Sequence, residues 1–211
     1  SKLEKTYKKN YKNKDEEENN SNLIKVILVG DSGTGKTQLI TVAAGFEFNS
    51  TSLTTTSCSY VQIKLQKNKR EYKINLWDTI GQEKYRSLTK IFLKDSKIVI
   101  FVYDITNRAT FESLKYWKKI IDDVLGSTPI FGVIGNKNDL YLEEKVKEDE
   151  GEAFAKSINA KFLYTSAKNE SNAFVKFIDQ ILDDYVEKKF EEREESIMID
   201  RGTKTNGAKC C

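Results

Sequence analysis

Residues 23–41 read LIKVILVGDSGTGKTQLIT, and this stretch decides how the rest of the chain is interpreted. An apolar run ends at Gly30, and a loop of small residues then closes with Gly35-Lys36-Thr37 and leads into a helix-like segment. The order of strand, GxxxxGK[ST] loop and helix is that of a phosphate-binding loop. A glycine-rich turn could match by chance, but the flanking strand and helix make that the weaker interpretation.

The chemistry of this loop suits phosphate. Glycines let the backbone curl so that successive N–H groups point inward, and the helix that follows adds its positive end. Lys36 can reach the β- and γ-phosphates, and the Thr37 hydroxyl can bind Mg²⁺. The predicted phosphate-binding residues are Asp31, Ser32, Gly33, Thr34, Gly35, Lys36 and Thr37, with Gly30 beginning the curl.

The overall composition excludes several classes of protein. Lys and Arg number 35 against 32 Asp and Glu, so the net charge of +3 argues against nucleic acid as the main partner. No apolar run approaches the roughly 20 residues needed to span a bilayer, and no signal peptide is recognised. The 3 cysteines, two of them adjacent at positions 210 and 211, do not suggest a disulfide framework. We therefore expect a cytosolic protein.

The first 22 residues are rich in Lys and Asn and include the acidic run Asp15-Glu16-Glu17-Glu18. Such a segment has too little apolar surface to offset its ordering entropy, so we predict a disordered N-terminal extension. A partner-binding arm is the alternative, although charge runs are usually only solvated.

The chain after the phosphate loop predicts a helix end, a loop and a β-hairpin. Gly45 is a natural residue to end the helix, and a polar, Thr/Ser-rich loop follows over residues 46–60. Alternating runs at 59–66 and 71–78 flank the sequence KNKR, which indicates a hairpin.

Asp78 directly follows the second alternating run. In a P-loop protein, a carboxylate at this point holds Mg²⁺ through water. A helix N-cap is the alternative for an isolated Asp, and the phosphate loop favours the Mg²⁺ role.

Strands and helices alternate through the rest of the chain. Near-continuous apolar runs predict buried parallel strands, and apolar residues at helical spacing predict amphipathic helices. The predicted strands lie in 97–106, 130–139 and 161–168, the last two with polar ends, and the predicted helices lie in 110–125, 148–158 and 174–186. We expect an α/β fold with a mainly parallel sheet covered on both faces, with its polar loops at the carboxyl ends of the strands.

These motifs, taken together, resemble those of a Ras-superfamily small GTPase, and within that superfamily a Rab protein. The similarity covers about residues 22–187 and includes GDSGTGKT at 30–37, DTIGQ at 78–82, NKND at 136–139 and SAK at 166–168. KINLWDT, KYRSLT, FVYDIT and the terminal Cys pair are the Rab-like features, whereas the C-a-a-X ending of Ras and Rho proteins is missing. The resemblance implies a three-layer P-loop GTPase domain with a six-stranded, mostly parallel sheet.

The resemblance assigns guanine recognition to two loops and one aromatic residue. The Asp139 carboxylate matches the paired N1–H and N2–H donors of guanine, which adenine lacks. Ala167 offers its N–H to guanine O6, and Phe48 packs edge-on against the base, although an ordinary half-buried Phe is the alternative. The implied guanine-binding residues are Phe48, Asn136, Lys137, Asp139, Ser166, Ala167 and Lys168.

The resemblance also assigns catalysis and the Mg²⁺ ligands. Gln82 orients water for attack on the γ-phosphate, Gly81 allows close backbone approach, and Lys36 completes the catalytic set. Thr55 matches the switch threonine that binds Mg²⁺ only when a γ-phosphate is present, with Thr54 and Thr56 as neighbouring alternatives. The implied Mg²⁺ ligands are Thr37, Thr55 and, through water, Asp78.

Two departures from the family pattern bear on the switch regions. Residues 56–60 read TSCSY where Rab proteins usually have Ile-Gly-Val/Ile-Asp-Phe, and only the aromatic at Tyr60 keeps its character. Ile80 replaces the usual Ala of D-T-A-G-Q, and overpacking of this kind can cost about 1–3 kcal/mol. A guanine-nucleotide-binding scaffold that does not cycle is therefore the alternative to a GTP-hydrolysing switch.

We accordingly predict a disordered extension at 1–22, a GTPase domain at 23–188 and a flexible tail at 189–211 that ends in a prenylation site at Cys210 and Cys211. The implied partners of this monomer are an exchange factor, a GTPase-activating protein, effectors, and the prenylation and GDI machinery. A cytoplasmic protein that cycles onto the cytosolic face of an endomembrane is expected, with Mg²⁺ as cofactor and GTP or GDP as ligand.

Overall fold

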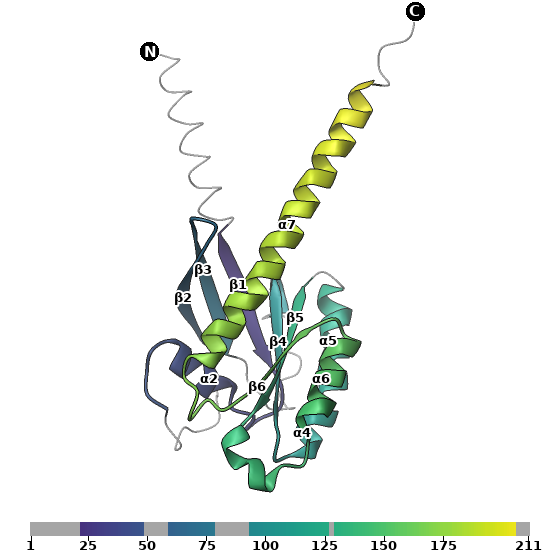
Figure 1. Ribbon diagram of the computed structural model, residues 1–211. Coiled ribbons are helices and arrows are strands. Elements are labelled where there is room, and N and C mark those ends of the chain that lie inside the picture. Colours follow the sequence, from purple (N-terminus) through teal and green to yellow (C-terminus); the bar gives the residue numbers. More distant parts are fainter. Residues whose placement is uncertain (1–21, 49–58, 79–92, 127–128, 206–211) are drawn as a thin grey trace, which may run out of the picture.

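The computed structural model describes residues 22–48, 59–78, 93–126 and 129–205 of the chain. Their strands form one 6-stranded sheet in the order β2-β3-β1-β4-β5-β6 (Figure 1). All neighbouring strands pair in parallel except β2 and β3, which are antiparallel. The strands are β1 Leu23–Val29, β2 Ser59–Lys67, β3 Arg70–Asp78, β4 Ile98–Asp104, β5 Ile130–Asn136 and β6 Lys161–Thr165. The predicted α/β class and mostly parallel sheet are confirmed.

Helices cover both faces of the sheet. The described helices are α2 Lys36–Ala43, α4 Arg108–Glu112, α5 Leu114–Leu125, the 3-10 helix η2 Asn138–Glu143, α6 Glu148–Ser157 and α7 Ala173–Thr205. Alternate residues of β1 enter opposite cores: Val26 and Leu28 pack with α2 and α7, whereas Ile27 and Val29 pack with α5 and α6. This alternation follows from the two-residue period of a strand and explains why β1 is apolar almost throughout.

The predicted hairpin is confirmed, with a two-residue turn. Lys67 of β2 pairs with Arg70 of β3, and the two residues between them, Asn68 and Lys69, have φ values of 50° and 64°. A turn with two left-handed residues matches the twist of the flanking strands. Asn tolerates that backbone region well, and Lys does so less readily.

The helical stripe predicted over 110–125 is divided in the structure. The Asn107 side chain accepts a hydrogen bond from the Ala109 N–H at 3.2 Å, so α4 begins earlier than the apolar pattern indicates. Ser113 separates α4 from α5 but keeps a helical backbone. The cap, rather than the apolar spacing, sets the start of this helical region.

The last helix extends further than predicted. We expect a flexible tail from residue 189, but α7 continues to Thr205, and residues 206–211 lie outside the described part of the chain. Among the side chains described up to Ser196, packing against the core ends at Val186, and the sequence after it consists largely of strong helix formers, with an ion pair of 2.9 Å between Lys189 and Glu192. Within the described residues, no helix is both long and apolar enough to cross a membrane.

Candidate guanine-nucleotide site

The phosphate loop joins β1 to α2. Two of its positions have to be glycine, because atoms of other strands lie too close to leave room for a side chain. Gly30 and Gly35 have φ values of 148° and 94°. A Cβ at Gly30 would collide with the backbone carbonyl of Val102 in β4, and a Cβ at Gly35 would collide with the Asn136 side chain. The loop is therefore pressed against β4 and β5 and cannot accept side chains at these points.

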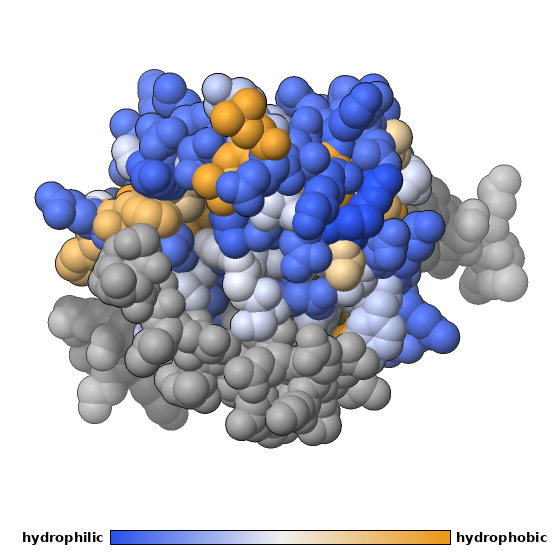
Figure 2. All heavy atoms as spheres, turned by 90° about the horizontal axis from the view of Figure 1, so that it is seen from below, coloured by the Kyte–Doolittle hydropathy of each residue, from blue (hydrophilic) through white to orange (hydrophobic). Residues whose placement is uncertain are grey.

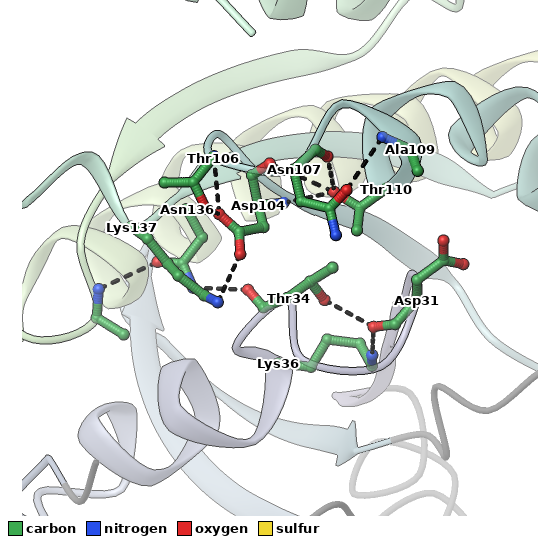
Figure 3. Close-up of polar contacts among 11 residues, drawn as sticks. Asp31, Thr34, Lys36, Asp104, Thr106, Asn107, Ala109, Thr110, Asn136 and Lys137 are labelled. Carbon is green, nitrogen blue, oxygen red and sulfur yellow. Dashed lines mark hydrogen bonds and ion pairs between the residues drawn. The ribbon is translucent and has the colours of Figure 1, made fainter. Parts of the chain in front are cut away.

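Lys36 lies inside the curve of this loop. Its Nζ donates to the carbonyl oxygens of Gly30 at 2.8 Å and Asp31 at 2.7 Å, and its side chain is buried (Figure 3). Burial lowers the pKa of Lys36 to about 8, while the carboxylates of Asp78 and Asp31 act to raise it. The ammonium is thus charged at neutral pH but poorly solvated, which prepares it to interact strongly with an anion.

The hydroxyl of Thr37 contacts the carboxylate that ends β3. Thr37 Oγ1 donates to Asp78 Oδ2 at 2.7 Å, and Asp78 is buried. The contact brings the first turn of α2 and the end of β3 together beside Lys36. Two hard oxygen groups at a phosphate loop are the kind of ligands that Mg²⁺ prefers.

Asn136, the last residue of β5, connects the phosphate loop to the second predicted recognition loop. Its Nδ2 donates to the Thr34 carbonyl oxygen at 2.8 Å, and its Oδ1 accepts from the Ala167 N–H at 3.2 Å. The residue is 1% exposed, so both hydrogen bonds are shielded from water. One side chain therefore joins residues 30–37 to residues 166–168.

The two predicted guanine loops lie side by side. Ser166 Oγ donates to Asp139 Oδ1 at 2.6 Å and accepts from the Lys168 N–H at 3.1 Å. Glu170 adds support, because its carboxylate accepts from Thr165 Oγ1 and Asn138 Nδ2. The Asp139 carboxylate is thus oriented by a neighbouring hydroxyl while its loop is braced from the other side.

The matches with known proteins agree with this geometry. Residues 25–183 match the Ras family. The chain is 36% identical to the Ras-related protein RIC2 of Oryza sativa subsp. japonica over 162 residues, which is 75% of each chain. It is also 36% identical to the Ras-related protein Rab-21 of Homo sapiens over 155 residues, 74% of this chain and 69% of that protein. The Ras-related protein SEC4 of Saccharomyces cerevisiae is 34% identical over 150 residues, 71% and 69% of the two chains.

The chain belongs to the Ras family. Within it the chain is Rab-like, and it is a GTP hydrolase of the small GTPase type. Its general role is that of a small GTPase in membrane trafficking.

The structure of this Ras-family domain adds a partner for Lys137 that sequence reasoning missed. Lys137 Nζ lies 2.6 Å from Asp104 Oδ2, and Asp104 Oδ1 accepts from the backbone N–H and the hydroxyl of Thr106 (Figure 3). Thr110 also holds the Asp104 backbone. The FVYDIT stretch contains Asp104 and Thr106. Its sequence does not show that Asp104 has a partner, because the loop with Lys137 comes close only in the folded structure.

A second missed residue is Trp117 of α5. Its indole Nε1 donates to Asp31 Oδ1 in the phosphate loop at 2.9 Å, and the Trp117 side chain is 1% exposed. The helical spacing of Trp117 predicts core packing, which is correct for the ring. The polar edge of the ring also fixes the loop residue whose carbonyl accepts from Lys36.

Phe48 lies beside the predicted base-binding loop. It packs partly buried against the core and lines a hollow of about 320 Å³ together with Phe46, Ala167, Lys168 and Asn172. The structure therefore places Phe48 in the same hollow as Ala167 and Lys168. Its contact with a base stays a prediction.

Figure 2 shows the end of the domain where the parallel strands finish, and its described surface is mainly hydrophilic with a few apolar places. Exposed apolar side chains near this end include Phe46, just after α2, and Leu142 of η2. A polar surface of this kind suits a nucleotide better than an apolar ligand.

Several predicted residues lie outside the described part of the chain. They are the switch residue Thr55, the catalytic pair Gly81 and Gln82, the departures at 56–58 and Ile80, and the terminal Cys210 and Cys211. Among the predicted site residues that are described, the phosphate loop and Asp78 meet at one point, and Phe48, 136–139 and 166–168 gather next to it.

Proposed function

We propose that this protein is a Mg²⁺-dependent GTP-hydrolysing switch that recruits effectors in vesicle trafficking. The observation that carries the proposal is the bridge made by Asn136 between the Thr34 carbonyl and the Ala167 N–H. This bridge holds a phosphate-binding loop and a base-recognition loop at a fixed separation, as a ligand with both chemical groups requires. Asp139 selects guanine over adenine through its two acceptor oxygens.

Thr37 and Asp78 would hold the Mg²⁺ ion, Asp78 through water and Thr37 through its hydroxyl. The fit is supported by their 2.7 Å contact beside the phosphate loop. Among the described residues, no group of three or more His, Cys, Asp or Glu side chains is placed to hold a metal, which suits an ion bound largely by phosphate and water. When bound, Mg²⁺ neutralises charge on the phosphate oxygens, and Thr55 is the proposed further ligand.

Catalysis is assigned to three residues. Lys36 neutralises charge on the β- and γ-phosphates, since its buried ammonium interacts with anions at low effective dielectric. Gln82 orients the attacking water, and Gly81 allows the backbone to approach the γ-phosphate. No arginine is recognised at a cis position, so intrinsic turnover should be slow, and a GTPase-activating protein that supplies one could add about 10³–10⁵-fold.

A scaffold that binds guanine nucleotide without cycling is the second candidate, favoured by the TSCSY sequence and Ile80. Single-turnover hydrolysis of bound GTP, with and without Mg²⁺, separates the two. We expect Mg²⁺-dependent hydrolysis that slows in Gln82→Leu while GTP affinity stays near that of the wild type. Hydrolysis that is absent, or that Gln82→Leu leaves unchanged with and without an activating partner, would favour the scaffold.

Attachment to the membrane is proposed to occur through prenylation of Cys210 and Cys211. Two lipid chains anchor stably, whereas one gives only marginal binding unless a polybasic patch assists it. The proposed partners are the exchange factor, the activating protein, effectors at the switch regions, and the prenylation and GDI machinery. The proposed location is the cytoplasm, with cycling onto the cytosolic face of an endomembrane.

The lipid anchor is tested by replacing both cysteines with serine. We expect this variant to leave membranes while its GTP affinity is unchanged, and we expect single replacements to loosen the protein substantially. Persistence of the double variant in the membrane fraction would refute the anchor.

A further inference from the structure

A groove lies at the end of the domain opposite the phosphate loop. It is bordered by the start of β1, the hairpin end of β3, the residue before β4, and the part of α7 that leaves the sheet (Figure 1). Its volume is about 460 Å³, within the range of small-ligand pockets. Neither guanine recognition nor GTP hydrolysis uses this groove.

The walls of the groove are basic. Arg70, Lys97, Lys189 and Arg193 line it, against one carboxylate, Glu192. Lys189 pairs with Glu192 at 2.9 Å, but among the described residues no carboxylate forms an ion pair with the other three cations. The groove therefore concentrates positive charge that the described part of the domain does not neutralise.

Two mostly buried tyrosines also line the groove. Tyr72 and Tyr185 are only 7% and 8% exposed, yet both line the hollow. Neither hydroxyl makes a hydrogen bond within the part of the chain that is described. Burial raises the pKa of Tyr185, so its phenol stays a hydrogen-bond donor. Phenol donors and several cations lining one groove favour an anionic ligand with several acceptor oxygens.

We propose that this groove binds the phosphorylated headgroup of an anionic membrane lipid of the phosphoinositide class. Phosphate groups match the chemistry, because Arg binds phosphate in a bidentate manner and Lys and phenol donors supply further hydrogen bonds. The position of the groove favours a phosphate that belongs to a lipid, since α7 leaves the domain at this groove and leads toward the C-terminus of the chain (Figure 1).

This inference rests on the proposed lipid anchor, which brings the same end of the domain to a membrane. A headgroup site there would add a second attachment and orient the nucleotide site toward the cytosol. It would also supply the basic surface that the tail lacks, because only Arg201, Lys204 and Lys209 are basic beyond Asp200.

The test uses the full chain, loaded with GDP and Mg²⁺ and without lipid on its cysteines, in vesicle co-flotation. Phosphatidylcholine vesicles are compared with vesicles that contain phosphatidylinositol bisphosphate, and with phosphatidylserine vesicles of matched surface charge. We expect binding only to the phosphoinositide vesicles, with competition by soluble inositol trisphosphate. Because the cysteines are unmodified and GDP is bound throughout, failure here would leave the GTPase and anchor proposals standing.

Two variants assign the binding to the groove. At about fivefold per basic residue, Lys97→Gln combined with Arg193→Gln should weaken binding about 25-fold. Tyr72→Phe combined with Tyr185→Phe removes only hydroxyls, keeps the ring packing, and should weaken binding roughly tenfold. The matched control is Lys115→Gln with Lys119→Gln, an equal charge change at exposed positions of α5 on the other face of the sheet, and it should bind like the wild type.

Three outcomes would overturn the proposal. Equal binding to the phosphatidylserine vesicles would indicate diffuse electrostatic attraction, and equal loss in the α5 control would place the contact elsewhere. Asn22, which borders the groove, follows closely on the acidic run at 15–18. Vesicle binding that appears only after those four carboxylates are changed to amides would assign the groove to the acidic run of the chain itself.

Discussion

The phosphate half of the site (residues 30–37 and Asp78) and its base half (residues 136–139 and 166–168) are held by different kinds of contact. In the phosphate half, Lys36 donates to two backbone carbonyls, and the close fit of the glycines shapes the loop. In the base half, side chains bind one another, as in the pair formed by Ser166 and Asp139.

This difference indicates which half of the site selects the base and which half binds the phosphates for hydrolysis. A loop shaped by backbone recognises any phosphate chain, because every residue type except proline supplies the same N–H group. A loop built from side chains can be re-specified by exchanging one functional group. Changes in the base half should therefore alter which nucleotide binds, and changes in the phosphate half should alter how tightly phosphate is held. Asn136 should affect both.

The largest expected effect is a change of base specificity. Asp139→Asn replaces an acceptor pair by one acceptor and one donor, so GTP affinity should fall about 10⁴-fold. Affinity for xanthosine triphosphate should rise, because its 2-oxo group requires a donor. Competition binding with both nucleotides measures the change, and Asn138→Ala in the same loop is the control. Equal GTP binding by Asp139→Asn and wild type would remove Asp139 from base recognition.

Breaking the bridge between the halves should come next. Asn136→Ala leaves the Thr34 carbonyl and the Ala167 N–H without their partner, at about 1–3 kcal/mol for each buried group. GDP should dissociate about 100-fold faster, and xanthosine diphosphate should be affected equally because the base preference is untouched. Stopped-flow release of a fluorescent nucleotide gives both rates. A change confined to one nucleotide would contradict the bridging role.

A smaller effect on nucleotide affinity, acting only through the binding of the phosphate groups, is expected from Trp117→Phe. This change keeps an aromatic ring in the core but removes the donor to Asp31, a hydrogen bond to a charged group worth about 1.5–3 kcal/mol. Affinity for GDP should fall roughly tenfold without a change in base preference. Asp31→Asn keeps an acceptor oxygen and serves as the conservative control. If Trp117→Phe and Asp31→Ala have fully additive effects, the indole does not act through Asp31.

Structural elements that depend only on residues close together in the sequence could be predicted from local sequence patterns. The strand and helix around residues 30–35, the β2–β3 hairpin and the buried β4 each have their own signature within a short window, and the structure confirms these elements. The motif order also predicted that the loops after β1, β3, β5 and β6 meet, since parallel strands place their carboxyl ends together.

Contacts between distant segments escaped prediction for a physical reason. Trp117 lies 86 residues from Asp31, and Lys137 lies 33 from Asp104, so no short window contains both partners. The length of α7 escaped for the opposite reason. Between Glu187 and Ser196, the part of α7 beyond the core whose side chains are described, no buried stripe marks a helix, and only the propensity of the residues and a local ion pair indicate one.

A modest effect on the base half is expected from Asp104→Asn. The amide keeps an acceptor for Thr106 but loses the ion pair with Lys137, which is partly exposed and therefore worth about 1 kcal/mol. GDP affinity should fall about fivefold, and the preference for guanine over xanthine should persist. Isothermal titration with both nucleotides checks this. A loss larger than that of Lys137→Ala would mean that Asp104 does more than position the lysine.

The smallest effect concerns pH and the phosphate half. Nucleotide phosphates favour protonated Lys36, whose pKa of about 8 is set by burial. Affinity should therefore be complete below pH 8 and decline as pH rises through that value, by about fourfold between pH 7 and pH 8.5. Lys36→Arg stays charged and should show a flat profile over this range. An equal decline in both proteins would assign the titration to another group.

Single-turnover hydrolysis of xanthosine triphosphate by Asp139→Asn, at saturating nucleotide and Mg²⁺, tests the central claim most directly. If the base half only selects the ligand and the phosphate half performs the chemistry, this variant should hydrolyse bound xanthosine triphosphate within about twofold of the wild-type rate on GTP. A rate that falls in parallel with GTP affinity would show that the two halves are not separable, and would contradict the account.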